Sequence, residues 1–172
     1  MELFIPYLVL AIIALVCVPF IIYGVFAMKS AAPFVPAMKK NVKKMIKEAN
    51  IQSDETVMDL GSGDGRIVRM AAPYAKESIG IEINPVLYHL SRFLHLFSRK
   101  KNITYLRKNL WKVSLAEVDV LFLFFISTKM PKLKEKIMKE MKPGSRVVSH
   151  TFSFPDWKPE KKHGIVSVYR VE

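Results

Sequence analysis

Three glycines alternate with other residues in the segment Asp59-Leu-Gly-Ser-Gly-Asp-Gly-Arg66. Glycine lets the backbone adopt positive φ angles and approach a ligand closely. Glu82 follows 21 residues after Gly61 (82 minus 61), within Gly80-Ile-Glu-Ile-Asn84. A carboxylate at that distance, at the tip of the next strand, can accept hydrogen bonds from both hydroxyls of a ribose. The pattern therefore predicts a site for a ligand that contains a nucleoside.

The residues around the glycines separate two nucleotide chemistries. A dinucleotide fingerprint, G-x-G-x-x-G, requires glycine at position 66, which is Arg66. Asp59 stands two residues before the first glycine. A carboxylate there repels a pyrophosphate but suits the cationic methionine end of S-adenosyl-L-methionine, which is the predicted cofactor. The alternative is an empty strand–helix turn with an exposed glutamate.

A second polar group follows the third predicted strand, in Arg107-Lys-Asn-Leu-Trp111. The side-chain oxygen of Asn109 can accept a hydrogen bond from the amino group of adenine. Leu110 or Trp111 would then cover the ring, although Trp111 is equally well explained as a core residue. The complete predicted cofactor site is Asp59, Gly61, Ser62, Gly63, Asp64, Gly65, Glu82, Ile83, Asn84, Asn109, Leu110 and Trp111.

The elements that position these residues alternate between strand and helix. Apolar runs predict strands over residues 56–60, 78–83, 102–106, 118–126, 146–152 and 164–171. Helical spacing predicts helices over residues 38–50, 64–74, 85–98 and 129–141. This order indicates an α/β domain with a mostly parallel sheet, whose ligand lies beyond the carboxyl ends of the strands.

Composition limits the other classes of function. The chain has 172 residues, with 27 Lys and Arg against 15 Asp and Glu, for a net charge of +12. The single cysteine excludes a disulfide framework and a cysteine-based zinc site, and the four histidines lack metal-ligand spacing, so we expect no metal. The basic charge raises nucleic acid as a partner, but the lysines are spread along the chain and we expect none.

The N-terminal segment predicts a membrane anchor. Residues 3–28 contain no charged side chain, and 26 helical residues extend about 39 Å, more than the roughly 30 Å core of a bilayer. Lysines follow this span and none precedes it, which places the remaining chain in the cytoplasm of a single-pass protein of the cell membrane. The predicted organisation is an anchor (1–28), a basic linker and helix (29–50) and a cofactor-binding domain (51–172).

Several stretches together resemble a known family: Ala32-Pro-Phe-Val-Pro-Ala37, the glycine segment, Gly80–Pro85, Asn109-Leu-Trp-Lys112 and Phe154-Pro-Asp-Trp-Lys-Pro159. This is the family of seven-β-strand protein lysine methyltransferases that includes the enzymes modifying the ATP synthase c-subunit and the adenine nucleotide translocase, with prokaryotic relatives. The resemblance implies a class I, Rossmann-like fold and methylation of a lysine ε-amino group. The family often has tyrosine at the position of Phe34 and aspartate at that of Asn109.

A lysine acceptor must lose its proton before it attacks, since its pKa is about 10.4 in water. A narrow apolar channel favours the neutral amine, so no catalytic base is assigned. The candidate substrate-binding residues are Phe34, Pro36, Phe125, Phe154, Pro155 and Trp157. We expect a protein substrate near the membrane; the alternatives are a lipid, quinone or ribosomal RNA methyltransferase, or a membrane-anchored module that binds the cofactor without catalysis.

Overall fold

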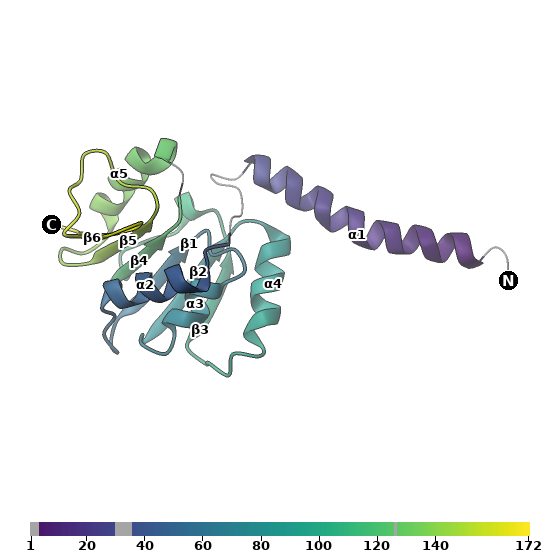
Figure 1. The fold of residues 1–172 in the computed structure, drawn as a ribbon, viewed down its shortest axis with the longest axis horizontal. Coiled ribbons are helices and arrows are strands. Elements are labelled where there is room, and N and C mark those ends of the chain that lie inside the picture. The colour runs from purple at the N-terminus through teal and green to yellow at the C-terminus, as the bar shows by residue number, and fades with distance from the viewer. Residues whose placement is uncertain (1–3, 30–35, 126) are drawn as a thin grey trace.

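The computed structural model describes residues 4–29, 36–125 and 127–172, with the side chains of the first helix described at 6–19, 21 and 24. Figure 1 shows a twisted sheet flanked by helices, with the first helix projecting from the domain. The helices are α1 (Phe4–Lys29), α2 (Lys39–Ala49), α3 (Arg66–Ala71), α4 (Pro85–His95) and α5 (Met130–Glu140). The strands are β1 (Thr56–Leu60), β2 (Glu77–Glu82), β3 (Ile103–Arg107), β4 (Val120–Leu123), β5 (Arg146–His150), β6 (Lys161–His163) and β7 (Val166–Arg170).

The seven strands form one sheet in the order β3-β2-β1-β4-β5-β7-β6. Strands β1 to β5 are parallel, whereas β7 runs antiparallel to both β5 and β6. The strand order reverses between β1 and β4, where Leu60 is paired with Leu123. Ligands bind at such a switch point in open α/β sheets. The predicted Rossmann-like α/β fold is therefore confirmed.

Several predicted element ends differ from the structure by one to three residues or more, and one strand was not predicted. Helix α3 ends at Ala71 rather than at residue 74, because Pro73 has no N–H to continue the helical hydrogen bonds. Strand β4 ends at Leu123, the last residue paired with β5, so Phe124 and Phe125 lie beyond it. Strand β6 is not predicted by periodicity, since its three side chains are all exposed and show no apolar alternation.

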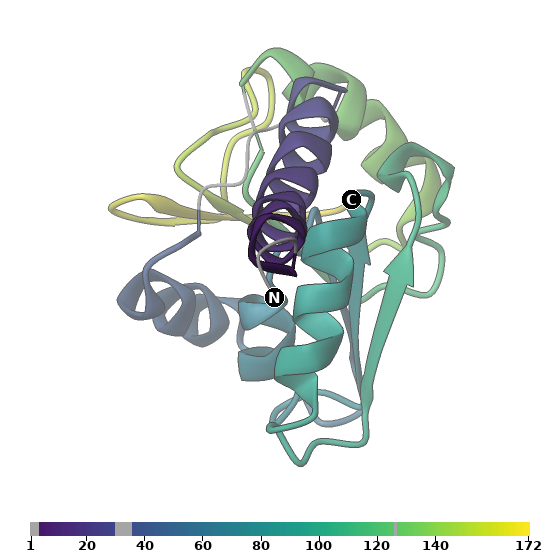
Figure 2. The same ribbon diagram turned by 90° about the vertical axis from the view of Figure 1, so that its right-hand side faces the viewer.

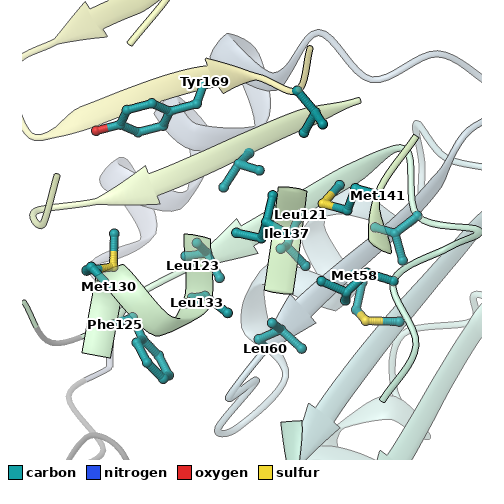
Figure 3. Packing of buried hydrophobic residues seen from close by; sticks show 14 of the residues in the cluster. Met58, Leu60, Leu121, Leu123, Phe125, Met130, Leu133, Ile137, Met141 and Tyr169 are labelled. Carbon is teal, nitrogen blue, oxygen red and sulfur yellow. The ribbon is translucent and has the colours of Figure 1, made fainter. Parts of the chain in front are cut away.

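Each face of the sheet buries its own apolar cluster. Figure 3 shows the cluster beneath α5, which includes Met58, Leu121 and Ile137. The opposite face is covered by α2 and α3, which pack against alternate residues of the same strands, such as Val57 and Phe122. Helix α2 belongs to this core although the sequence grouped it with the linker. The two clusters hold the carboxyl ends of the central strands in fixed positions.

Helix α1 runs from Phe4 to Lys29 and contains Pro19. Its described side chains are mostly exposed and apolar. Across the residues that the structure describes, no helix combines the length and the hydropathy needed to cross a bilayer. The transmembrane anchor predicted over residues 1–28 is therefore not supported.

Adjacent residues of α5 provide a test of the core. Ile137 is fully buried, whereas 41 % of Met138 is exposed. Ile137→Ala should lower the free energy of unfolding by about 2–5 kcal/mol, because it leaves a cavity in the cluster. Met138→Ala should change it by less than about 0.5 kcal/mol. Chemical denaturation of both variants measures the difference, and equal effects would contradict the described packing.

Candidate functional site

The backbone of the glycine turn after β1 is accessible to a ligand. Gly61, Gly63 and Gly65 all have positive φ angles, of 80°, 55° and 75°. The Gly61 and Ser62 N–H groups both donate to the carbonyl of Ile81 in β2, at 2.8 and 2.9 Å. A Cβ atom built on Gly61 has no heavy atom within 4 Å, so space remains above the end of β1.

Glu82, the last residue of β2, joins this turn to the next one. Its Oε2 accepts a hydrogen bond from the Gly63 N–H at 2.9 Å, and its Oε1 accepts from the Asn84 N–H at 2.8 Å. The side chain is buried. An ionised carboxylate offers about four lone-pair sites, so each oxygen retains capacity for one further donor. This geometry suits the two adjacent hydroxyls of a ribose.

Asp59 lies buried in β1, one strand away from Glu82. Burial raises the pKa of its carboxyl group to about 8, and the nearby negative charges of Glu82 and Asp64 contribute to the rise. The group is therefore mostly protonated at neutral pH. A cation bound nearby would favour the ionised form and lower this pKa again. The carboxyl end of β1 thus suits a positively charged ligand.

Arg66 links the glycine turn to the chain that precedes α2. Its guanidinium pairs with Asp64 at 2.7 Å and also donates to the carbonyl of Ala37 at 2.6 Å. The Asp64 hydrogen bond is the main cause that raises the pKa of Arg66. Residue 37 is therefore held beside the glycine turn. The neighbouring Pro36 is exposed, and Phe34, the other predicted substrate-binding residue here, lies outside the described residues.

The Tyr105 side chain leaves no room for a side chain at two of the glycine positions. This tyrosine was not identified from the sequence. A Cβ atom on Gly65 would clash with the Tyr105 hydroxyl oxygen, and one on Gly80 would lie 2.8 Å from the Tyr105 ring. The hydroxyl donates to the Gly65 carbonyl at 3.3 Å. Burial is the main cause that raises the pKa of Tyr105 to about 12. Gly65 and Gly80 are thus required by protein packing.

The two predicted asparagines cap helices. The Asn84 side chain accepts from the Val86 N–H at 2.9 Å and starts α4, where Pro85 occupies the first turn. The Asn109 side chain accepts from the Trp111 N–H at 3.0 Å, at the start of the 3-10 helix η1 (Leu110–Lys112). The Asn84 oxygen also accepts from the Leu87 N–H at 3.4 Å, so both of its lone pairs are engaged. The Asn109 oxygen keeps one lone pair for another donor. Ile83 is partly exposed between Glu82 and Asn84.

The predicted aromatic residues divide into two groups. Trp111 contacts Phe125 with ring centroids 6.1 Å apart, and the Lys132 ammonium lies 4.9 Å from the Trp111 ring centroid. Phe154 and Trp157 instead pack with Tyr169, at centroid distances of 5.0–5.1 Å. Phe154 is buried and Pro155 is exposed in the turn that follows. The Trp111–Phe125 pair lies just beyond the carboxyl end of β4.

His150, at the carboxyl end of β5, was also not selected from the sequence. It is buried, and its ring lies 4.5 Å from that of Phe124. Nδ1 lies 2.8 Å from the Thr151 hydroxyl, whereas Nε2 has no hydrogen-bond partner among the described residues. Burial lowers the pKa of this imidazole. A single histidine that ends an apolar strand gives no motif, so only the fold indicates its position.

The residues present fit S-adenosylmethionine on structural grounds. Ser62 Oγ is buried without a hydrogen-bond partner among the described residues, so one polar group of the glycine turn is unsatisfied. Gly61 leaves open space, Glu82 has spare acceptor capacity, and Asp59 favours a cation. A pyrophosphate fits less well, because the acidic side chains of Asp59, Asp64 and Glu82 lie at this edge.

Comparisons with known proteins agree with this chemistry. The profile of the ANTKMT methyltransferase domain matches residues 59–161. A protein-lysine N-methyltransferase of Saccharolobus islandicus is 35 % identical over 136 residues, 75 % of this chain and 82 % of the relative. An ATP synthase c-subunit lysine N-methyltransferase of Xenopus laevis is 34 % identical over 142 residues, 79 % of this chain, which spans only 60 % of that relative.

A solved structure resembles the domain over most of its length. It is an RNA methyltransferase from Salinibacter ruber in complex with S-adenosyl-L-homocysteine. The TM-score is 0.73 at 30 % identity, covering 80 % of this chain and 92 % of the other. S-adenosylhomocysteine is what remains of S-adenosylmethionine after its methyl group has left.

Asp59 yields a prediction with an unusual sign. The folded protein holds the Asp59 proton up to about pH 8, whereas the unfolded chain releases it near 3.8. Unfolding therefore releases a proton between these pH values, and wild-type stability falls as pH rises through this window, by at most about 1.4 kcal/mol per pH unit. Asp59→Asn should thus stabilise the cofactor-free protein, increasingly from about pH 4 to about pH 8.

Chemical denaturation of the cofactor-free protein at several pH values measures this effect. Asp54→Asn is the matched control, because Asp54 is exposed and should show no such trend. Parallel pH profiles for the two variants would contradict the raised pKa of Asp59.

Proposed function

We propose, from the premise that the chain belongs to the ANTKMT methyltransferase family, that it methylates a lysine of a protein at a membrane surface. The chain is an S-adenosylmethionine-dependent protein-lysine methyltransferase. The membrane location of its substrate is the part that we infer. The observation that carries the assignment of the site is Glu82, a buried carboxylate with spare acceptor capacity at the carboxyl end of β2, next to the switch-point strand β1.

The chain's own residues would hold the cofactor at the ends of three strands. Glu82 would accept from the ribose hydroxyls, and Asp59 would balance the cationic end. The second lone pair of Asn109 would accept from the adenine amino group, with Ile83 and Leu110 beside the ring. S-adenosylmethionine supplies a methyl group that its positively charged sulfur already activates. The protein therefore needs mainly to align the acceptor and exclude water.

The residues that follow β4 are the best candidates for binding the lysine amine that accepts the methyl group. Trp111 and Phe125 form an apolar wall, and Phe124 contacts the neutral imidazole of His150. An ammonium group that enters apolar surroundings loses solvation, which lowers its pKa and favours the neutral amine. Pro36, Pro155 and Trp157 remain candidate contacts for the substrate backbone. This arrangement supports an amine acceptor without a dedicated base.

RNA is the second candidate substrate. It is favoured by the name of the Salinibacter relative and by the net charge of +12. The lysine assignment is favoured by the names of the curated relatives and by the matched domain. The two candidates differ in which macromolecule becomes labelled, so one experiment separates them.

The membrane part of the proposal rests on α1. The described side chains on this helix, among them Leu8, Ile12 and Leu15, are apolar and about half to three-quarters exposed. Such a surface is unfavourable in water over this length, and lipid is an apolar partner of matching chemistry. A substrate in or on the same membrane would then be concentrated near the catalytic domain.

Methyl transfer from labelled S-adenosylmethionine into membrane and soluble fractions tests the substrate class. Wild-type protein should label a protein band, and Glu82→Gln should reduce labelling at least about 100-fold, because an amide replaces the charged acceptor. Glu77→Gln is the matched control at the other end of β2, where the side chain accepts only from Thr104 among the described residues. Label in RNA or lipid would overturn the lysine assignment.

Removal of residues 1–28 tests the membrane part separately. The shortened protein should bind S-adenosylhomocysteine as before, because the site lies at the carboxyl ends of β1 to β4. It should lose methylation of a membrane-embedded substrate while retaining activity on a soluble peptide from that substrate. Full activity on the membrane-embedded substrate would show that α1 is not needed for access to it.

A further inference from the structure

Helix α4 and the two residues that follow it, Leu96 and Phe97, expose apolar side chains. The exposed fractions are 40 % for Leu90, 57 % for Phe93, 73 % for Leu96 and 73 % for Phe97. The Phe93 and Phe97 rings pack edge to face with centroids 5.4 Å apart, so they form one continuous surface. The opposite side of the helix, at Leu87 and Ser91, is buried against the domain. Contiguous exposed apolar patches of this kind mark interaction sites.

The charges around this face have a single sign. Between Ile83 and Ala116 the sequence contains seven Lys and Arg and no Asp or Glu. Arg92 lies within α4, and Arg99, Lys100 and Lys101 lie in the turn after it; all four are exposed. The apolar strip is therefore bordered by cations, with no acidic side chain in the same segment. A partner for this face must be apolar at its centre and negative at its boundary.

The position of α4 points to the same partner as α1. Figure 1 shows α4 at the side of the domain from which α1 projects. Figure 1 also shows α4 running crosswise to α1, and Figure 2, which looks toward that side, shows the two helices next to each other. Residues of the two helices are in contact. Both helices therefore present exposed apolar side chains at this side of the domain.

We propose that α4 and the basic turn after it rest on an anionic lipid bilayer. Helices that lie in the membrane interface combine phenylalanine and leucine on one face with lysine and arginine beside it. Anionic headgroups complement Arg92, Arg99 and the two lysines, while the acyl boundary accepts Phe93, Leu96 and Phe97. An RNA would match the cations but leave the aliphatic side chains without a partner. The proposal concerns lipid contact and stands apart from methyl transfer.

An environment-sensitive fluorophore on α4 tests this contact. The full chain carries Cys17→Ser, which removes its only cysteine, and Leu96→Cys labelled with NBD. With vesicles of phosphatidylcholine and phosphatidylglycerol in equal parts, the NBD emission should shift to the blue. The fluorophore should also become accessible to a quencher placed just below the headgroups. With pure phosphatidylcholine the shift should be much smaller. Met138→Cys on α5, also apolar and partly exposed, is the matched control and should show no shift.

A charge variant separates this contact from any binding through α1. Replacing Arg99, Lys100 and Lys101 with glutamine should weaken the partition of the labelled α4 onto anionic vesicles by about tenfold or more. The affinity for S-adenosylhomocysteine should stay unchanged, which shows that the variant is folded. Vesicle-bound protein with an unshifted Leu96→Cys label would overturn the proposal, since α1 alone would then make the contact. A blue shift produced by RNA or by self-association, and absent with vesicles, would also overturn it.

Discussion

The two backbone hydrogen bonds that Glu82 accepts are the interaction on which the site depends. Within the described residues, the N–H groups of Gly61 and Ser62 bond to the backbone of β2. The next residue, Gly63, is held by the Glu82 carboxylate instead. The other oxygen fixes Asn84, whose side chain in turn starts α4. One side chain therefore sets the spacing between the turns that follow β1 and β2. Because both bonds use main-chain donors, they preserve the orientation of the carboxylate before any ligand arrives.

This preorganisation places several acidic groups close together in a basic protein. Burial and the charges of Glu82 and Asp64 disfavour the ionised form of Asp59. The packing of β1 offsets this unfavourable free energy, because buried apolar clusters on both faces of the sheet hold the strand in place. A cationic ligand relieves the repulsion, whereas an anionic ligand would increase it. The same unfavourable electrostatics that reduce stability thus provide selectivity for the positively charged end of the cofactor.

The sequence predicted those features that depend on local pattern. The β1 boundaries, the glycine turn and the position of Glu82 follow from apolar runs and spacing within one β-α-β unit, and the structure agrees. Tyr105 and His150 could not be found in this way, because their importance comes from strands brought together by the sheet. Pattern also favoured Asn84 as a ligand contact, whereas the structure shows its oxygen engaged as a helix cap. Strand β6 has no apolar signal at all, since only its backbone pairing with β7 defines it.

Asn84 connects the cofactor site to the outer surface of the domain. Its N–H is bonded to Glu82 and its side chain caps α4, so the first turn of that helix is fixed relative to the ribose-binding carboxylate. The exposed apolar residues of α4 lie only about two to three helical turns further on. A short, capped helix transmits position with little bending over that length. A surface that contacts α4 would therefore hold the ribose-binding carboxylate at a fixed distance from that surface.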